Sequence, residues 1–428
     1  MSSMRKRIIV SGPALSRSGY GEQTRFALRA LRSQEDKFDI YAVNLPWGAT
    51  GNIIEDTEER QWIEQTLLKT AMHAPNNLNP PFEISLQVTI PNEWELAAPV
   101  NIGYTAGIET TKVAPQWLVK GNTMDKIIVV SEHAKQVYET TSCEATNQQT
   151  GEVVPDYRCE TPITVVNYPV RTSDPKKPEN IHLDYDFNFL TVAQWGPRKN
   201  LDNTIRWFVE EFKDEEIGLL IKTNVAKDCV MDRGLTEHKL RVLLAPYGER
   251  KCKVYLLHGN LSDGEMTWLY KNKKIKSLVS LTHGEGFGLP LFEAAYNALP
   301  IIAPLWSGQV DFLSAPNKTG KMRPMIAKVG YTLQPVQDYA AWPGVIEKDS
   351  MWCFPNEKDY KRQLREVYKN HGRFKAQANK LRTYILKNFT EEQKYEEFVD
   401  AVCDKRDFEF DAAAWFEQLN NENIETHD

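Results

Sequence analysis

Short apolar segments alternate along the chain with segments in which apolar residues recur every three or four positions. The apolar segments are rich in β-branched residues and bounded by glycine, proline or small polar residues, which predicts strands. In the first half, strands are predicted at residues 7–11, 39–44, 83–90, 101–105, 126–131 and 163–166. In the second half, they are predicted at residues 189–193, 217–222, 253–258, 275–282 and 301–303.

Segments of helical composition separate these strands. Helices are predicted at residues 22–32, 61–73, 132–138, 291–298 and 391–403, and around an apolar face formed by Ile205, Phe208, Val209 and Phe212. Ser131 is expected to cap the helix at 132–138, because its hydroxyl can accept a hydrogen bond from a free N–H of the first turn. Regular alternation of strands and helices predicts the α/β class.

Prolines and charges concentrate in residues 171–186, which is typical of a linker. We therefore predict an N-terminal domain at 1–170 and a C-terminal domain at 187–403, each with a doubly wound sheet. Ligands of such sheets bind at the carboxyl ends of the strands, here facing a central cleft. The segment 404–428 contains four aromatic residues, and we expect it to dock back on the N-terminal domain.

Length and composition suit a two-domain globular protein. The chain has 428 residues, of which 41% are hydrophobic, and a net charge of −6, which gives no overall signature of nucleic-acid binding. The basic residues 1–7 are followed by an apolar stretch, 8–10, that is too short for a signal peptide. Because no apolar run reaches membrane-spanning length, we expect a cytoplasmic protein.

The six cysteines are scattered and include no C-x-x-C pair. This spacing favours reduced thiols over a structural zinc site, and no cluster of metal-ligand residues is apparent, so no metal is predicted. Cys143 and Cys159 bracket a polar insert and would approach each other if that insert forms a hairpin.

The most informative segment is 283–293, His-Gly-Glu-Gly-Phe-Gly-Leu-Pro-Leu-Phe-Glu. It joins the strand at 275–282 to the helix at 291–298, and Pro290 suits the first helical position. The free N–H groups and the dipole of a helix N-terminus favour an anion. Glu285 on the loop and Glu293 on the helix are expected to face one ligand, and carboxylates pair well with sugar or ribose hydroxyls.

This segment resembles the E-x7-E motif of retaining glycosyltransferases of family 4, which have the GT-B fold. The resemblance implies two Rossmann-like domains, with the acceptor in the first and the nucleotide-sugar donor in the second. It places Glu285 beside the transferred sugar and Glu293 on the ribose of the nucleotide. The backbone amides of Phe287, Gly288 and Leu289 are then expected to approach the sugar and the diphosphate.

Other segments are similar to further elements of the same family. The strand and turn at 190–201 carry adjacent cations, and the resemblance assigns Arg198 and Lys199 to the donor diphosphate. Two fixed cations there can neutralise the charge of a leaving phosphate, which is a metal's task in other transferases. The segment 300–313 loosely resembles the second glycine loop that closes over the donor, with Gln309 and Asp311 near the expected glycine and acid.

The remaining candidate residues lie on three other loops. Gly19 and Gly21 resemble the N-terminal glycine turn near the donor phosphates, and Asn260 lies in a segment similar to the base-binding turn. Many family members have a histidine after the strand at 101–105, whereas this chain has none there, and Glu109 is the nearest ionisable residue. Glu109 is therefore our candidate for orienting an acceptor hydroxyl or contacting the donor sugar.

These observations predict a retaining glycosyltransferase that uses a UDP-, GDP- or ADP-sugar and needs neither metal nor cofactor. The acceptor is left open between a glycan, a protein, a small molecule and modified DNA. A viral-type DNA base glycosyltransferase is one alternative, because the basic segments 271–276 and 362–365 can contact phosphates, although the acidic net charge opposes it. A catalytically silent GT-B protein that binds sugar nucleotides or glycans is another. A GT-B phosphorylase is disfavoured, since no lysine lies in a pyridoxal-phosphate motif.

Overall fold

The computed structural model describes residues 5–73, 82–146, 153–179 and 181–403. Two six-stranded sheets of parallel strands form its two halves. The first sheet has the order β2-β1-β3-β4-β5-β8 and the second the order β11-β10-β9-β12-β13-β16. Relative to chain order, the second arrangement is the one found in dinucleotide-binding domains, and the first is the flavodoxin-like one. The α/β class and the two Rossmann-like, doubly wound halves predicted above are confirmed.

The strands of the first sheet are β1 (Lys6–Gly12), β2 (Phe38–Asn44), β3 (Ile84–Val88), β4 (Val100–Thr105), β5 (Lys126–Val129) and β8 (Ile163–Val165). Those of the second are β9 (Asn188–Val192), β10 (Gly218–Thr223), β11 (Lys253–His258), β12 (Ile275–Val279), β13 (Ile301–Pro304) and β16 (Ala327–Val329). Every residue of the central strand β3 is buried, because helices cover both faces of a parallel sheet.

The helices of the first half are α1 (Gly19–Arg32), α2 (Glu58–His73), α3 (Pro115–Gly121) and α4 (Glu132–Thr140). Those that follow the linker are α5 (Leu201–Phe212), α6 (Val230–Leu244), α7 (Asp263–Lys271), α8 (Leu289–Tyr296), α9 (Glu357–Lys369), α10 (His371–Asn388) and α11 (Glu391–Val402). Ser131 caps α4 as predicted, because its hydroxyl accepts a hydrogen bond from the Ala134 amide at 3.2 Å.

Antiparallel pairs of short strands extend from the two sheets. They are β6 (Cys143–Thr146) with β7 (Val153–Tyr157), β14 (Ser314–Pro316) with β15 (Met322–Pro324), and β17 (Tyr331–Pro335) with β18 (Met351–Pro355). The polar insert between Cys143 and Cys159 thus contains a paired ribbon, and both cysteines are free thiols.

The predicted strand at 275–282 is too long, because β12 ends at Val279. Residues 281–283 are nevertheless buried, since the chain continues as an interior loop. The Ser280 amide donates to the Ile302 carbonyl at 3.0 Å, an ordinary hydrogen-bond length, and the pairing of β12 with β13 ends there. An apolar composition cannot distinguish such a buried loop from a strand.

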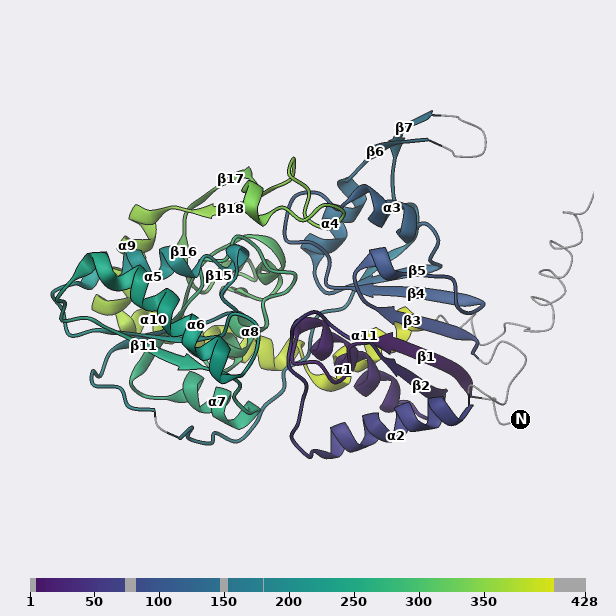
Figure 1. The fold of residues 1–428 in the computed structure, drawn as a ribbon, viewed down its shortest axis with the longest axis horizontal. Helices are drawn as coiled ribbons and strands as arrows, with labels where there is room; N and C mark the ends of the chain where they lie inside the picture. Colours follow the sequence, from purple (N-terminus) through teal and green to yellow (C-terminus); the bar gives the residue numbers. More distant parts are fainter. Residues whose placement is uncertain (1–4, 74–81, 147–152, 180, 404–428) are drawn as a thin grey trace, which may run out of the picture.

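The chain crosses between the halves twice. Residues 166–187 lead from the first sheet to the second, and the end of α10 returns beside them, where the Val170 amide bonds to the Phe389 carbonyl at 2.7 Å. Helix α11 then packs on the N-terminal half, with the Phe398 ring 5.2 Å from Phe26 and 5.1 Å from Tyr104 (Figure 1). The expected docking of 404–428 lies outside the described residues, and the proposed domain boundaries stay predictions.

A second bridge between the halves comes from the segment that joins β17 to β18 and from the first residue of β18. The Asn92 side chain donates to the Gly344 carbonyl at 3.0 Å, and the Thr111 amide donates to the Met351 carbonyl at 2.9 Å. The Lys112 ammonium and the Asp349 carboxylate form an ion pair nearby. Together with α11, these contacts join the two halves.

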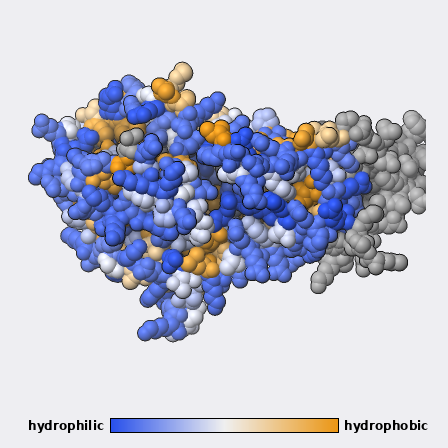
Figure 2. Space-filling model, turned by 90° about the horizontal axis from the view of Figure 1, so that it is seen from below, coloured by the Kyte–Doolittle hydropathy of each residue, from blue (hydrophilic) through white to orange (hydrophobic). Residues whose placement is uncertain are grey.

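The surface in Figure 2 is mostly hydrophilic, with small and scattered apolar areas. Within residues 5–403, apart from the undescribed gaps, none of the helices is long and apolar enough to cross a membrane.

Candidate functional site

The candidate site lies at the switch point of the second sheet, where the chain leaves β9 and β12 in opposite directions. Neighbouring loops diverge at such a point and leave room for a ligand at the carboxyl ends of the strands. The loop after β9 contains a short 3-10 turn, Pro197–Lys199, followed by Asn200 in a left-handed conformation with φ 52°. This turn directs Arg198 and Lys199 toward the loop after β12, which carries Glu285.

The two cations and Glu285 form one connected cluster. Lys199 Nζ lies 2.6 and 2.7 Å from the two carboxylate oxygens of Glu285. Arg198 Nη1 donates to Glu285 Oε2 at 3.1 Å and to the Gly284 carbonyl at 2.6 Å. Arg198 Nη2 lies 3.1 Å from Glu109 Oε1, which belongs to the loop after β4 of the first sheet. The four residues that we predicted as catalytic are therefore in contact, across the two halves.

Burial makes the charges of this cluster depend on one another. Glu285 is only 8% exposed. Although burial opposes ionisation, the charges of Lys199 and Arg198 lower the pKa of Glu285 to about 2. Burial and the neighbouring Arg198 lower the pKa of Lys199, whereas Glu109 and Glu285 outweigh burial and raise that of Arg198. The two positive charges of Arg198 and Lys199 equal the two negative charges of Glu285 and Glu109. A ligand phosphate would therefore compete with the two carboxylates for the cations.

Three backbone segments meet at the Glu285 loop with little space for side chains. A Cβ on Gly284 would lie 2.4 Å from the Glu109 carbonyl oxygen, and one on Gly286 would lie 2.7 Å from that of Ala106. On the other side, the Gly308 amide donates to the Glu285 carbonyl at 2.9 Å, and Ser307 Oγ accepts from the Glu285 amide at 2.8 Å. The segment 300–313, which loosely resembles the second glycine loop of the family, thus fixes the backbone that presents Glu285.

Gly308→Ala is expected to lower the free energy of unfolding by about 1–3 kcal/mol, because its Cβ would lie 1.9 Å from the Gly286 carbonyl oxygen. The obstacle is backbone, which cannot rotate away as a side chain can. Gly196→Ala is the matched control, since a Cβ there meets nothing within 4 Å. Urea unfolding of both variants measures the difference, and equal stabilities would contradict this account of the loop.

The start of α8 supplies the predicted backbone groups. Gly288 precedes the helix in a left-handed conformation with φ 98°, and Leu289 begins it. The first N–H groups of a helix have no intrahelical partner, so Phe287, Gly288 and Leu289 can offer amides to an anion. The Phe287 side chain is not available, because it is buried against Tyr168 at 5.2 Å and Phe312 at 4.8 Å.

Glu293 lies one turn further along α8 and borders a cavity between the halves. The cavity has a volume of about 200 Å³ and is lined from the N-terminal half by Glu22 and from the second half by Tyr270 and Glu293. Tyr270 donates its hydroxyl to Glu293 Oε2 at 2.7 Å. Burial raises the pKa of Glu293 to about 7. The two carboxylates thus have opposite environments. Cations lower the pKa of Glu285, whereas Glu293 has a tyrosine as its hydrogen-bond partner and burial raises its pKa.

A larger cavity of about 420 Å³ continues along the same cleft. Glu22, Arg171 and Asp263 border both cavities, and Leu261 to Gly264, which follow β11, border the larger one. The predicted Asn260 lies next to this stretch but is not among its lining residues, and its amide donates to Asp228 at 3.0 Å. The structure therefore places Asn260 at the rim and brings the residues after it into the cleft.

The predicted glycines lie in the first turn of α1. Ser18 caps this helix by accepting from the Gly21 amide at 3.0 Å, and a Cβ on Gly21 would lie 2.0 Å from the Ser16 carbonyl oxygen. A Cβ on Gly19 would meet nothing within 4 Å. Tyr20 links this turn to the end of β4, with its hydroxyl 2.8 Å from Thr105 Oγ1. Close packing against the Ser16 carbonyl therefore excludes a side chain at Gly21, whereas there is space for one at Gly19.

Sequence reasoning missed several polar residues of the cleft. Glu22 forms ion pairs with Arg29 at 2.6 Å, Arg25 at 3.0 Å and Arg171 at 3.3 Å. The spacing of Glu22, Arg25 and Arg29 on one helix face was a signal for part of this network. His133 was also missed. Its ring packs 5.1 Å from Trp306, and burial lowers its pKa to about 4, so it is a neutral imidazole.

Comparison with known proteins supports the fold and gives a partial sequence match. No family model matches the chain. A segment of 118 residues is 30% identical to the serotype-specific mannosyltransferase WbdA of Escherichia coli, and it covers 27% of this chain but only 13% of WbdA.

Solved structures match over nearly the whole chain at low identity. HepE of Anabaena, solved with UDP and glucose, has a TM-score of 0.57 at 11% identity and covers 92% of this chain and 99% of its own. Sucrose-phosphate synthase of Thermosynechococcus elongatus has a TM-score of 0.57 at 13% identity, covering 92% and 98%. The lipopolysaccharide outer core galactosyltransferase WaaB has a TM-score of 0.53 at 14% identity, covering 93% and 99%. The chain therefore has the GT-B fold of these glycosyltransferases.

Proposed function

We propose that this protein is a retaining glycosyltransferase that moves a sugar from a nucleotide-sugar donor to an acceptor hydroxyl without a metal ion. The observation that carries the proposal is the buried cluster of Arg198, Lys199 and Glu285 at the switch point, on loops of which one leads into α8, where Glu293 borders the cleft cavity. A fold hosts many activities, so the proposal rests on the site and not on the fold alone.

In the proposed complex the donor diphosphate lies between the Arg198–Lys199 turn and the N-terminus of α8. The cations exchange part of their pairing with Glu285 and Glu109 for phosphate oxygens and stabilise the charge that develops there. Glu285 positions the sugar and supports positive charge at its ring, while Glu293 accepts hydrogen bonds from the ribose.

The reaction breaks the bond between the anomeric carbon and the phosphate oxygen and forms one from that carbon to the acceptor oxygen. The leaving phosphate takes the proton of the acceptor hydroxyl, so no enzyme carboxylate need become a nucleophile. Glu109, held by Arg198 at 3.1 Å on the N-terminal side, is placed to orient the acceptor or the donor sugar.

Thermal shift against UDP-, GDP-, ADP- and CMP-sugars tests the proposed donor site. We expect one nucleotide to stabilise the protein and Glu293→Gln and Arg198→Ala to remove that effect. The exposed Glu392 and Arg206 provide the matched controls Glu392→Gln and Arg206→Ala. If no nucleotide sugar stabilises the wild type, or if both site variants respond as it does, the proposed donor site is wrong.

Donor affinity is expected to rise with pH up to about pH 7. Ribose hydroxyls donate to a carboxylate, so the complex holds fewer protons at Glu293 than the free protein, in which burial raises the pKa to about 7. Affinity then falls by up to about tenfold for each pH unit below that value. Calorimetric titration from about pH 5.5 to about pH 8 measures the slope of donor affinity against pH. Glu293→Gln should bind weakly with no such slope, and a flat wild-type profile would contradict the ribose role.

Removal of metal ions is expected to leave transfer unchanged, because Arg198 and Lys199 neutralise the leaving phosphate. The measurement is the initial rate after dialysis against a chelator, with and without added Mg²⁺ or Mn²⁺. Loss of the rate on dialysis and its recovery with either metal would show that the two cations do not suffice.

A further inference from the structure

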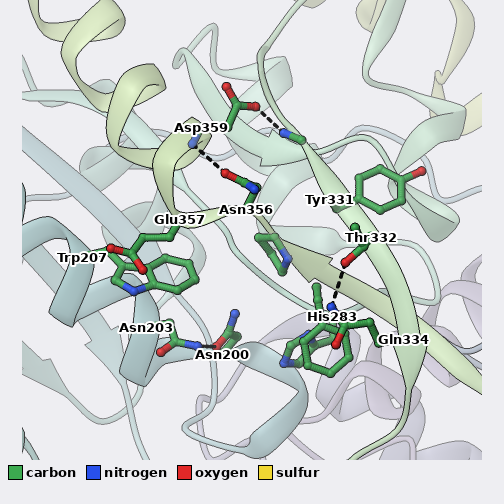
Figure 3. A pocket seen from close by; sticks show the side chains of 13 residues that line it. Asn200, Asn203, Trp207, His283, Tyr331, Thr332, Gln334, Asn356, Glu357 and Asp359 are labelled. Atoms are coloured by element: carbon green, nitrogen blue, oxygen red, sulfur yellow. Dashed lines mark hydrogen bonds between the residues drawn. The ribbon is translucent and has the colours of Figure 1, made fainter.

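A separate cavity of about 540 Å³ lies within the C-terminal half, outside the cleft between the halves. Its volume is in the range of small-molecule sites, about 300–1,000 Å³. The cavity is bounded by the start of α5, the strands β17 and β18, and the start of α9 (Figure 3). Trp207 and Glu357 lie on one side of it, and Tyr331 and Thr332 on the other.

The floor of this cavity adjoins the proposed catalytic cluster without including it. Asn200 follows Lys199 directly, and His283 precedes Glu285 by two residues. Asn200 donates to the Leu281 carbonyl at 3.1 Å, and the His283 ring stacks on Trp352 at 4.9 Å with an interplanar angle of 11°. These contacts fix the floor in a packed interior.

The lining chemistry disfavours an anionic ligand. Among the described residues that border the cavity, none is lysine or arginine, whereas Glu357 and Asp359 are carboxylates. Glu357 pairs with Lys361 at 2.6 Å, and Asp359 accepts from the Gly330 amide at 2.5 Å. The cations that pair with these carboxylates, Lys361 and Arg362, do not line the cavity. A phosphate or a nucleotide would therefore meet carboxylates and no lysine or arginine among the described lining residues, unlike the cleft beside Arg198 and Lys199.

The same lining suits a neutral molecule with many hydroxyls. Asn203 and Gln334 carry amides that can donate and accept together, and Thr332 adds a hydroxyl. Gln334 and Thr332 are exposed, and their mutual hydrogen bond of 2.8 Å is one that a ligand can replace. Trp207 is half-buried, so its ring offers an apolar surface beside these polar groups. An aromatic surface with nearby amides can contact the face of a sugar ring and exchange hydrogen bonds with its hydroxyls.

We propose that this cavity is a binding site for a neutral oligosaccharide, distinct from the nucleotide cleft. The inference goes beyond the proposed transferase function and does not depend on it, because binding in this cavity involves neither Arg198 nor Glu293. The cavity and the cleft are lined by different residues. The protein can therefore bind a glycan in the cavity while the cleft is free to bind a nucleotide.

The test is binding of neutral tetrasaccharides of mannose, glucose and galactose, measured by saturation-transfer NMR and calorimetry on the full chain without nucleotide. We expect millimolar binding of at least one of them and none of an anionic hyaluronan tetrasaccharide. Asn203→Ala/Gln334→Ala should weaken binding by at least about fivefold, since it removes ligand hydrogen bonds. Gln136→Ala/Asn379→Ala, a double change of exposed residues elsewhere, should bind as the wild type does.

Thermal unfolding of each variant verifies that it folds, and excess UDP-, GDP- and ADP-sugars in separate titrations show whether the cleft is involved. The proposal is overturned if no neutral tetrasaccharide binds at millimolar concentration. It is also overturned if Asn203→Ala/Gln334→Ala binds with unchanged affinity, or if a nucleotide sugar displaces the tetrasaccharide. A failure of nucleotide binding alone would count against the proposed transferase and leave this result intact.

Discussion

Glu285→Gln is expected to lower the free energy of unfolding by about 3 kcal/mol at pH 7, because it removes the buried carboxylate that pairs with both Arg198 and Lys199. The pKa of Glu285 leads to the same magnitude. Its ordinary value of 4.5 is lowered to about 2, and each pKa unit corresponds to about 1.4 kcal/mol. Since the pKa is lowered in the folded state, this stabilisation is present above pH 4.5 and is lost as the pH falls toward 2.

Chemical denaturation of the wild type and Glu285→Gln at a series of pH values measures this effect. The difference between them should be constant from neutral pH down to about 4.5 and should shrink below it. Glu392→Gln, on the exposed face of α11, is the control and should differ little from the wild type at any pH. A Glu285→Gln variant as stable as the control at pH 7 would contradict the paired, buried state of this carboxylate.

Arg198→Ala is expected to lower kcat by about 10²–10³-fold, which is typical for loss of one group that stabilises developing charge. Arg198 also joins the two halves through its ion pair with Glu109 at 3.1 Å. Its removal takes one positive charge away from both Glu109 and Glu285. The measurement is steady-state kinetics with the donor identified by thermal shift.

Arg206→Ala is the matched control, because Arg206 is an exposed cation on α5 of the same half. It should keep kcat within about twofold of the wild type, as surface changes have small effects. An Arg198→Ala enzyme with unchanged kcat and raised KM would show that Arg198 contributes only to binding, and would contradict its proposed role on the leaving phosphate.

The architecture could be predicted because it depends on local patterns. Apolar β-branched segments such as 189–193 become parallel strands when helices cover both faces of their sheet, and residue order then fixes which loops meet. The end of β12 was less predictable. Thr282 and His283 are buried in a loop by contacts with distant residues, including a hydrogen bond from the Cys353 amide to the His283 carbonyl at 3.0 Å. Composition carries no information about such a contact.

In the candidate site, too, local sequence patterns were informative and contacts with distant residues were not predictable. Arg198, Lys199 and Glu285 were predicted because their two segments resemble motifs of one glycosyltransferase family, and the structure places them in contact. The partners of Glu293 were missed, since Tyr270 lies on α7 and nothing in its local sequence connects it to α8. The same holds for the cavity beside Trp207, whose walls come from α5 and from strands more than a hundred residues later.

Donor turnover followed by NMR tests the central claim most directly. The donor sugar identified by thermal shift is incubated with the full chain, with and without candidate acceptors, and the anomer of the first product is recorded. We expect slow hydrolysis or transfer with the anomeric configuration of the donor retained, and a loss of that signal in Arg198→Ala and Glu285→Gln. Inverted configuration would contradict the proposed mechanism, and a bound donor that is never turned over would identify the protein as a binder without transferase activity.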